Sequence, residues 1–288
     1  MAKVINQSSD SQYLIGKLRK LGLTFICQLD DVNKLRDNFT QYVADVISFK
    51  KNIITDKIKK SNDREQKIKD SISQDKKRVV GKYVLKLKLK IIINNRTKLE
   101  NQFEDIPNKN RKTFRKGLRF VENNLNIYYG AIGEEIVSKE LVKLPENYFV
   151  FNNFYVKLKH PIINKSKNWY LKWFQIDHVV VGPTGIFAIE TKNWSKKRLE
   201  RDDSWGFEQI DMFGEALSIL IKKMAGIKQR PKRILVFTNN FESDYYPNVV
   251  QLYYKKLNQY ITSREIMFSN SLIKKTMKFL IEKNNKKI

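Results

Sequence analysis

Asp177, Glu190 and Lys192 are the residues of this chain whose types and spacing best suit catalysis. Two facing carboxylates can share one divalent cation, and a neighbouring lysine can orient or help to deprotonate a water molecule. Metal-dependent hydrolysis of phosphodiesters requires this set. Solvated positions on an open strand are the common alternative for such residues. Against that alternative, Asp177 interrupts the apolar run Ile176 to Val181, and Glu190 directly follows Ile189.

Two predicted strands and a tight turn position these side chains. Residues 169–181 are rich in aromatic and β-branched side chains, and residues 186–192 alternate between two faces. Gly-Pro-Thr-Gly at 182–185 is typical of a hairpin turn, because proline presets one backbone angle and glycine accepts unusual ones. The sequence therefore predicts a β-hairpin.

The length of the turn decides which residues face each other. With a two-residue loop, Gly182 pairs with Gly185 and Asp177 faces Glu190, about 5 Å away between β-carbons. With a three-residue loop and Gly185 in a left-handed bulge, Thr191 lies opposite Asp177 instead. The residues leave both registers open, and the proposed chemistry favours the first.

A helix is expected from Gly130 to Leu144, and it carries a further candidate, Glu134. Glu134, Val137 and Leu141 fall on one stripe of that helix, whereas Glu135 points away from it. The glycines at 130 and 133 would let the stripe approach a sheet closely. Glu135 suits a surface position at a helix start, so we prefer Glu134 as the functional residue.

Three segments together resemble the nuclease-related domain (NERD) family. They are Gly-x-x-Gly-Glu at 130–134, Gln-Ile-Asp-His at 175–178 and Ile-Glu-Thr-Lys-Asn at 189–193, and the likeness covers about residues 128–240. That family is similar to the PD-(D/E)XK nuclease superfamily. The resemblance implies an α/β fold, with a restriction-endonuclease-like core in which helices flank a mixed central sheet.

The resemblance also implies roles for individual residues. It makes Asp177, Glu190 and Thr191 metal-binding residues for Mg²⁺ or Mn²⁺, and it has Lys192 assist the attacking water. The implied activity is hydrolysis of phosphodiester bonds in DNA by an endonuclease, in defence against foreign DNA.

Two helical residues complete the implied site, with one departure from the family pattern. Glu134 matches the family's glutamate on the preceding helix, and Gln209 falls where the family has a helical glutamine. The family commonly has Asn-Pro before that glutamine and a glycine soon after the Lys-Asn-aromatic run. This chain has Gly206-Phe207 and Ser195-Lys196 there, so the assignment of Gln209 is weaker than that of the hairpin.

The charge of the chain points to a polyanionic partner. Its 288 residues carry a formal net charge of +26. Phosphate backbones attract distributed lysines through release of counterions, so we expect nucleic acid, and DNA in preference to RNA. RNA cleavage, or a non-catalytic module that binds nucleic acid and oligomerises, are the alternative functions.

Cysteine content and hydropathy bear on the cellular setting. Cys27 is the only cysteine and permits no internal disulfide. The longest apolar runs fall well short of the roughly 18 residues of a membrane span. We expect a cytoplasmic protein with no membrane partner.

The first part of the chain predicts a helical, coiled-coil-like region over residues 1–110, in front of a nuclease domain at 111–288. Apolar residues recur with a period of seven, which is typical of a coiled-coil seam. The seam consists of Val32, Leu35, Phe39, Tyr42, Val46, Phe49 and Ile53. We expect residues 80–104 to fold back on it as a helix, although residues 85–91 also alternate as a strand would. We further expect a linker at 105–110 and a homo-oligomer formed through these helices.

After the hairpin, the sequence predicts a helix from Phe207, a buried strand at 233–238, a further strand at 266–268 and a basic helix from Asn270. His178 points to the sheet face opposite Asp177, so we expect it to have a structural hydrogen-bonding role.

Overall fold

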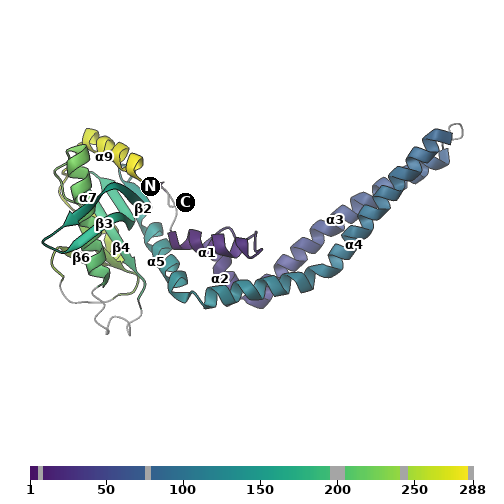
Figure 1. Ribbon diagram of the computed structural model, residues 1–288, viewed down its shortest axis with the longest axis horizontal. Helices are drawn as coiled ribbons and strands as arrows, with labels where there is room; N and C mark the ends of the chain where they lie inside the picture. Colours follow the sequence, from purple (N-terminus) through teal and green to yellow (C-terminus); the bar gives the residue numbers. More distant parts are fainter. Residues whose placement is uncertain (6–8, 75–78, 195–204, 241–245, 285–288) are drawn as a thin grey trace. The chain divides into compact units, whose positions relative to one another are not determined.

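The computed structural model of the protein describes residues 1–5, 9–74, 79–194, 205–240 and 246–284. The chain forms two compact units (Figure 1). One unit comprises Met1–Leu14 with Asn124–Ile288, and the other comprises Ile15–Asn123. The first contains the sheet and the second the long helices, which confirms a mixed α/β fold with a long N-terminal helical region.

A mixed sheet organises the first unit. Its strands lie in the order of the sequence: β1 Lys3–Ile5, β2 Phe149–Asn164, β3 Trp169–Gly182, β4 Gly185–Lys192, β5 Lys232–Phe237 and β6 Val249–Tyr253. The pairs β2–β3 and β3–β4 are antiparallel, whereas β1–β2, β4–β5 and β5–β6 are parallel. The expected hairpin thus forms the centre of a mixed sheet.

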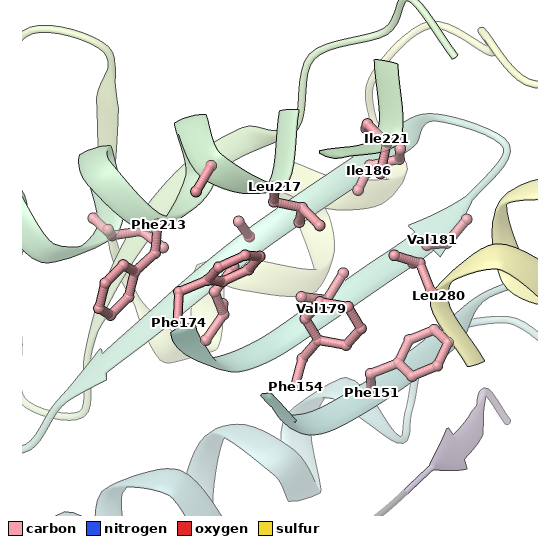
Figure 2. Packing of buried hydrophobic residues seen from close by; sticks show 14 of the residues in the cluster. Phe151, Phe154, Phe174, Val179, Val181, Ile186, Phe213, Leu217, Ile221 and Leu280 are labelled. Carbon is pink, nitrogen blue, oxygen red and sulfur yellow. The ribbon is translucent and has the colours of Figure 1, made fainter. Parts of the chain in front are cut away.

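Helices cover both faces of this sheet (Figure 1). On one face lie α5 (Leu125–Leu141) and α8 (Leu257–Thr262), the latter preceded by a 3-10 turn at Tyr254–Lys256. On the other face lie α7 (Trp205–Ala225) and α9 (Asn270–Lys283). Figure 2 shows that second core, where Phe213 and Leu217 of α7 pack over Phe154 and Phe174 of the sheet.

The strand expected at residues 266–268 is wrong. This segment is irregular, and the backbone N–H groups of Met267 and Phe268 both donate to the carbonyl of Pro183, at 2.8 and 2.9 Å. The sixth strand is β6 instead. A short apolar run matches a strand in sequence, but here Ile266 and Met267 are exposed and the backbone of this loop holds the turn between β3 and β4.

The second unit is dominated by an antiparallel helical hairpin. Helix α1 (Ser9–Lys20) begins in the first unit, α2 covers Leu29–Asp37, and the hairpin consists of α3 (Phe39–Gln74) and α4 (Val79–Glu122). Lys50 Nζ donates to Asn110 Oδ1 at 2.6 Å, and Arg96 pairs with Glu65 at 2.5 Å, which fixes the antiparallel alignment. The expectation that residues 80–104 fold back as a helix is confirmed.

The predicted seam is wrong at its last two residues. Val32 and Leu35 are buried and Phe39, Tyr42 and Val46 are partly buried, but Phe49 is 66% and Ile53 40% exposed. Beyond Val46 most of the partly or fully buried positions of α3 follow a different phase: Ile47, Lys51, Ile54, Ile58, Ser61, Glu65, Ile68 and Ile72. The period of seven counted from Val32 therefore stays on the buried side as far as Val46 and leaves it from Phe49.

The linker expected at 105–110 is also wrong. These residues lie inside α4, which contains Pro107. Ile106 is buried, and the side chain of Asn110 donates to the carbonyl of Ile106 at 2.6 Å while accepting from Lys50. Contacts with α3 therefore hold this segment helical despite its proline. The helix ends instead at Glu122, and α5 starts after Asn124.

Candidate active site

A cavity of about 770 Å³ opens where the N-terminal half of α5 meets the middle of β3 and the end of β4. All the residues proposed from the sequence as catalytic or metal-binding line it: Glu134, Asp177, Glu190, Thr191, Lys192 and Gln209. Residues from α5, β3, β4 and α7 therefore meet in one place.

The turn between β3 and β4 sets the register of the two strands that carry Asp177 and Glu190. Pairs run from Gly182 with Gly185 to His178 with Ile189, which confirms the two-residue loop and excludes the alternative. A side chain at Gly182 would lie 2.2 Å from the ring of Tyr148. Glycine is thus required there for close packing of the turn.

The β3–β4 ladder of backbone pairs ends at His178 and Ile189. Beyond it, the side chain of Asp177 supplies the next hydrogen bond between the two strands. The N–H of Thr191 donates to Asp177 Oδ2 at 2.8 Å. This bond holds the Asp177 carboxylate against the backbone of β4, beside Glu190. The two acidic groups are thereby placed by the fold and not by free side-chain rotation.

Glu190 and Lys192 form a buried pair on β4. Lys192 Nζ lies 2.8 Å from Glu190 Oε1 and 3.3 Å from Gln209 Oε1. Glu190 is only 3% exposed. Its other carboxylate oxygen, Oε2, is buried and has no hydrogen-bond partner within the described part of the chain.

The electrostatics of the carboxylate pair follow from this burial. Burial, and next the charge of Asp177, raise the pKa of Glu190 to about 8, against the opposing effects of Lys192 and Gln209. Burial also raises the pKa of Asp177, although Lys192 and the Thr191 N–H oppose the shift. One lysine does not compensate two buried carboxylates, so the site favours either a bound proton or a cation.

Glycine 206, at the start of α7, explains how Lys192 is accommodated. A β-carbon there would lie 2.9 Å from Lys192 Cε and 3.2 Å from Trp194 Cη2. This is the position where the chain departs from the family's Asn-Pro, and the small residue lets α7 approach the lysine. Ser195 and Lys196, the other departure, lie outside the described residues.

The two candidate glutamates of α5 have different environments. Glu134 is 7% exposed and lines the cavity, whereas Glu135 pairs with Lys139 at 2.6 Å on the outer side. A β-carbon at Gly133 would lie 2.8 Å from Asn193 Cβ. As expected, the glycine brings the helix directly against the end of β4.

Asn193 was not assigned a role from the sequence, although it lies in the Lys-Asn motif. Its side chain donates to the carbonyl of Tyr129 at 2.9 Å and accepts from Thr238 Oγ1 at 2.6 Å. Asn193 therefore joins β4 to α5 and to the end of β5. Asp10 of α1 also lines the cavity and lies against Gly130. The sequence around Asp10 does not predict this contact.

His178 does not line the cavity and makes its contact with β2 instead. Its Nδ1 lies 2.7 Å from Asn152 Oδ1, and Asn152 Nδ2 donates to Ser138 Oγ at 2.8 Å. Since Oδ1 must therefore accept, His178 Nδ1 carries the proton. Burial lowers the pKa of His178 to about 3, which keeps it neutral. These contacts agree with a structural role.

A metal ion here would need ligands beyond acidic side chains. Across the described ranges, no group of three or more His, Cys, Asp and Glu side chains is arranged to hold one. Asp177 and Glu190 supply two carboxylates, and main-chain carbonyls are oxygen ligands of the same kind.

Residues 129–250 match the nuclease-related domain (NERD) family model. The match confirms the resemblance and includes every residue proposed for the site. It covers less than half of the chain and leaves out the α3–α4 hairpin and Asp10. The NERD region suggests a nuclease-related function and a hydrolase activity.

One similar curated protein is an uncharacterized protein of Bacillus anthracis, 35% identical over 75 residues. The aligned part is 26% of this chain and 31% of that protein, so the chain spans about a third of its relative's length. No solved structure matches the chain. In the described parts of the chain, no helix combines the length and apolarity needed to cross a membrane.

Proposed function

We propose that the chain is a Mg²⁺- or Mn²⁺-dependent endonuclease that hydrolyses phosphodiester bonds in DNA, with a restriction-endonuclease-like core. The observation that carries this proposal is the carboxylate pair of Asp177, which is partly buried, and Glu190, which is buried, with Lys192 beside it in one cavity of the NERD region.

The residues present fit a hard divalent cation. Glu190 Oε2 is buried without a partner in the described chain, and the raised pKa of Glu190 reflects an unmet need for positive charge. Asp177, Glu190 and the main-chain carbonyl of Thr191 would hold the ion through oxygen, the ligand type that Mg²⁺ prefers. When bound, the ion neutralises charge on the scissile phosphate and acidifies water.

The protein's own side chains then orient the reaction. Lys192, held between Glu190 and Gln209, directs its ammonium group into the cavity, where it stabilises the attacking water and the developing negative charge. Arginine would be a poor substitute, since it is larger and keeps its proton. Glu134 lies on α5 and lines the same cavity, from where it would orient water close to a bound ion.

The central experiment is a cleavage assay with purified full-length protein. Supercoiled plasmid, single-stranded DNA and RNA are each incubated with Mg²⁺, with Mn²⁺ or with EDTA. We expect DNA to be cut with either ion and to stay intact in EDTA. Intact DNA under every condition would contradict the proposal and favour a non-catalytic nucleic-acid-binding module, and cutting of RNA alone would favour the ribonuclease alternative.

Charge and resemblance support the substrate and setting that we propose. The net charge of +26 favours a polyanionic substrate. A role in defence against foreign DNA follows from the family resemblance, and a single cysteine fits a cytoplasmic setting.

We also propose that the α3–α4 hairpin forms a homo-oligomer, through a face other than the one the sequence suggested. Large apolar side chains of the hairpin are 40–66% exposed: Phe49 and Ile53 on α3, and Val84, Leu87 and Ile91 on α4. The residues packed between the two helices define the a and d positions of each heptad. Counted from these positions, all five exposed side chains lie on one flank of the antiparallel pair. A second copy would cover this flank.

A further inference from the structure

The β2–β3 ribbon continues past the cavity and carries aromatic side chains. Tyr155 pairs with Gln175, and Lys157 pairs with Trp173. Gln175 lines the cavity. From Gln175 the paired strands β2 and β3 therefore lead away from the cavity.

Alternation along the strands determines which side chains share a face with Gln175. Phe154 and Phe174 point into the core beneath α7 (Figure 2). Their neighbours Tyr155 and Trp173 point to the opposite face, which is the face of Gln175.

Two of these rings form an accessible pair. The ring centroids of Tyr155 and Trp173 are 6.0 Å apart at an interplanar angle of 36°, and Trp173 is 49% exposed. Cross-strand aromatic pairs stabilise sheets, so packing alone is the simplest role for them. Packing does not require half of an indole to remain in water.

Cations accompany the aromatic rings. Lys157, opposite Trp173, is exposed. Further along β3, Tyr170 is 52% exposed and the ammonium of Lys172 lies 5.7 Å from its ring. Exposed aromatic rings interleaved with lysines suit a single nucleic-acid strand, since bases stack on the rings and phosphates meet the ammonium groups.

We propose that Tyr155 and Trp173 form a stacking platform for unpaired bases, so that the substrate of the neighbouring cavity is nucleic acid with a single-stranded segment. This inference rests on the proposed nuclease function. Trp173 and Asp177 are four residues apart along β3, roughly 13 Å, which equals about four stacked nucleotides at 3.4 Å each. A duplex keeps its bases stacked inside and cannot use the platform.

Binding of labelled oligonucleotides to the full-length protein tests this proposal. Fluorescence anisotropy is measured in EDTA with a single-stranded oligonucleotide and with a hairpin-capped duplex of the same length. Trp173→Ala is compared with Trp173→Phe, which keeps an aromatic ring, and with Tyr83→Ala, which removes a 66% exposed aromatic from the α4 helix. Circular dichroism verifies folding, and Trp173→Leu serves if the alanine variant fails to fold.

We expect Trp173→Ala to weaken single-strand binding about tenfold, with duplex binding changed less than twofold. Trp173→Phe should retain most of the single-strand affinity, and Tyr83→Ala should leave both affinities unchanged. Unchanged single-strand affinity in Trp173→Ala, or equal losses for both probes, would overturn the platform.

The outcome is separable from that of the nuclease proposal. Binding in EDTA does not depend on cleavage, so a catalytically silent protein can still show the selective loss. Conversely, a protein that cuts DNA while Trp173→Ala binds single strands normally would retain the proposed function without the platform.

Discussion

The backbone N–H of Thr191 donates to the carboxylate of Asp177 at 2.8 Å, where the ladder of β3 and β4 gives way to the cavity. This bond gives Asp177 two functions, since one oxygen closes the hairpin and the other remains for the cavity. Substitutions at Asp177 should therefore differ in stability even where they agree in activity.

Asp177→Asn should abolish cleavage but preserve folding, because the amide oxygen can still accept from Thr191. Asp177→Ala should abolish cleavage and also destabilise the protein by about 1–3 kcal/mol, since a buried N–H loses its partner. Plasmid cleavage and urea denaturation measure the two effects. Equal stability of the two variants would argue against the closing role of this bond.

Glu190 should make the stability of the metal-free protein depend on pH. Its pKa is raised from 4.5 to about 8 on folding, so the folded state holds a proton that the unfolded state has released. Stability from this group is then complete below pH 4.5 and is lost as pH rises through 8. Thermal denaturation in EDTA should show this decline, and Glu190→Gln should flatten it.

Addition of Mg²⁺ should reverse that decline. A bound cation would replace the proton that Glu190 holds, so the rise in melting temperature should be larger at pH 8.5 than at pH 6. A shift of equal size at both values, or an undiminished shift in Glu190→Gln, would place the ion elsewhere.

Gly206→Ala tests how closely α7 must approach Lys192. The added β-carbon would lie 2.9 Å from Lys192 Cε, so the lysine must move and the cleavage rate should fall about tenfold or more. Gly16→Ala is a suitable control, because a β-carbon at Gly16 meets nothing within 4 Å. That change should leave cleavage unaltered and stabilise α1 by up to about 1 kcal/mol.

Glu134→Gln should reduce cleavage more than Glu135→Gln. Glu134 lines the cavity, while Glu135 forms an exposed i,i+4 pair with Lys139 that contributes only about 0.3–0.5 kcal/mol. Single-turnover rates of both variants make the comparison. Equal rates would remove the reason to prefer Glu134.

Sedimentation of the full-length protein tests the exposed flank of the α3–α4 hairpin. The wild-type protein should sediment as a dimer or larger species at micromolar concentration, and Phe49→Lys with Leu87→Lys should yield monomers. Ser48→Lys introduces the same charge at an exposed position on the other flank and should change nothing. A monomeric wild-type protein would contradict the proposal.

The candidate site was largely predictable because its key residues lie close together in sequence. Asp177 and Glu190 lie on strands joined by a two-residue turn, so turn chemistry reduced the choice to two registers, and the expected chemistry selected the one that the structure has. Asp10 was not predictable, since it reaches the cavity from a helix far from the hairpin in sequence.

The helical region shows the opposite case. Its helices were expected, but the buried face was predicted only as far as Val46, because the buried positions of α3 shift in phase after that residue. Likewise Pro107 predicts a linker locally, and only packing against α3 makes it helical. Local patterns fix the type of an element more reliably than its partner.

The carbonyl of Pro183 accepts hydrogen bonds from the backbone N–H groups of Met267 and Phe268. The order in which the ribosome adds these residues therefore affects when the turn is held in place. The turn that joins β3 and β4 is synthesised long before the residues that hold it in place. On the ribosome the hairpin would therefore be complete in sequence but not yet fastened. We expect a chain that lacks residues 266–288 to show no nuclease activity in the plasmid assay, so that activity begins only when this segment has folded.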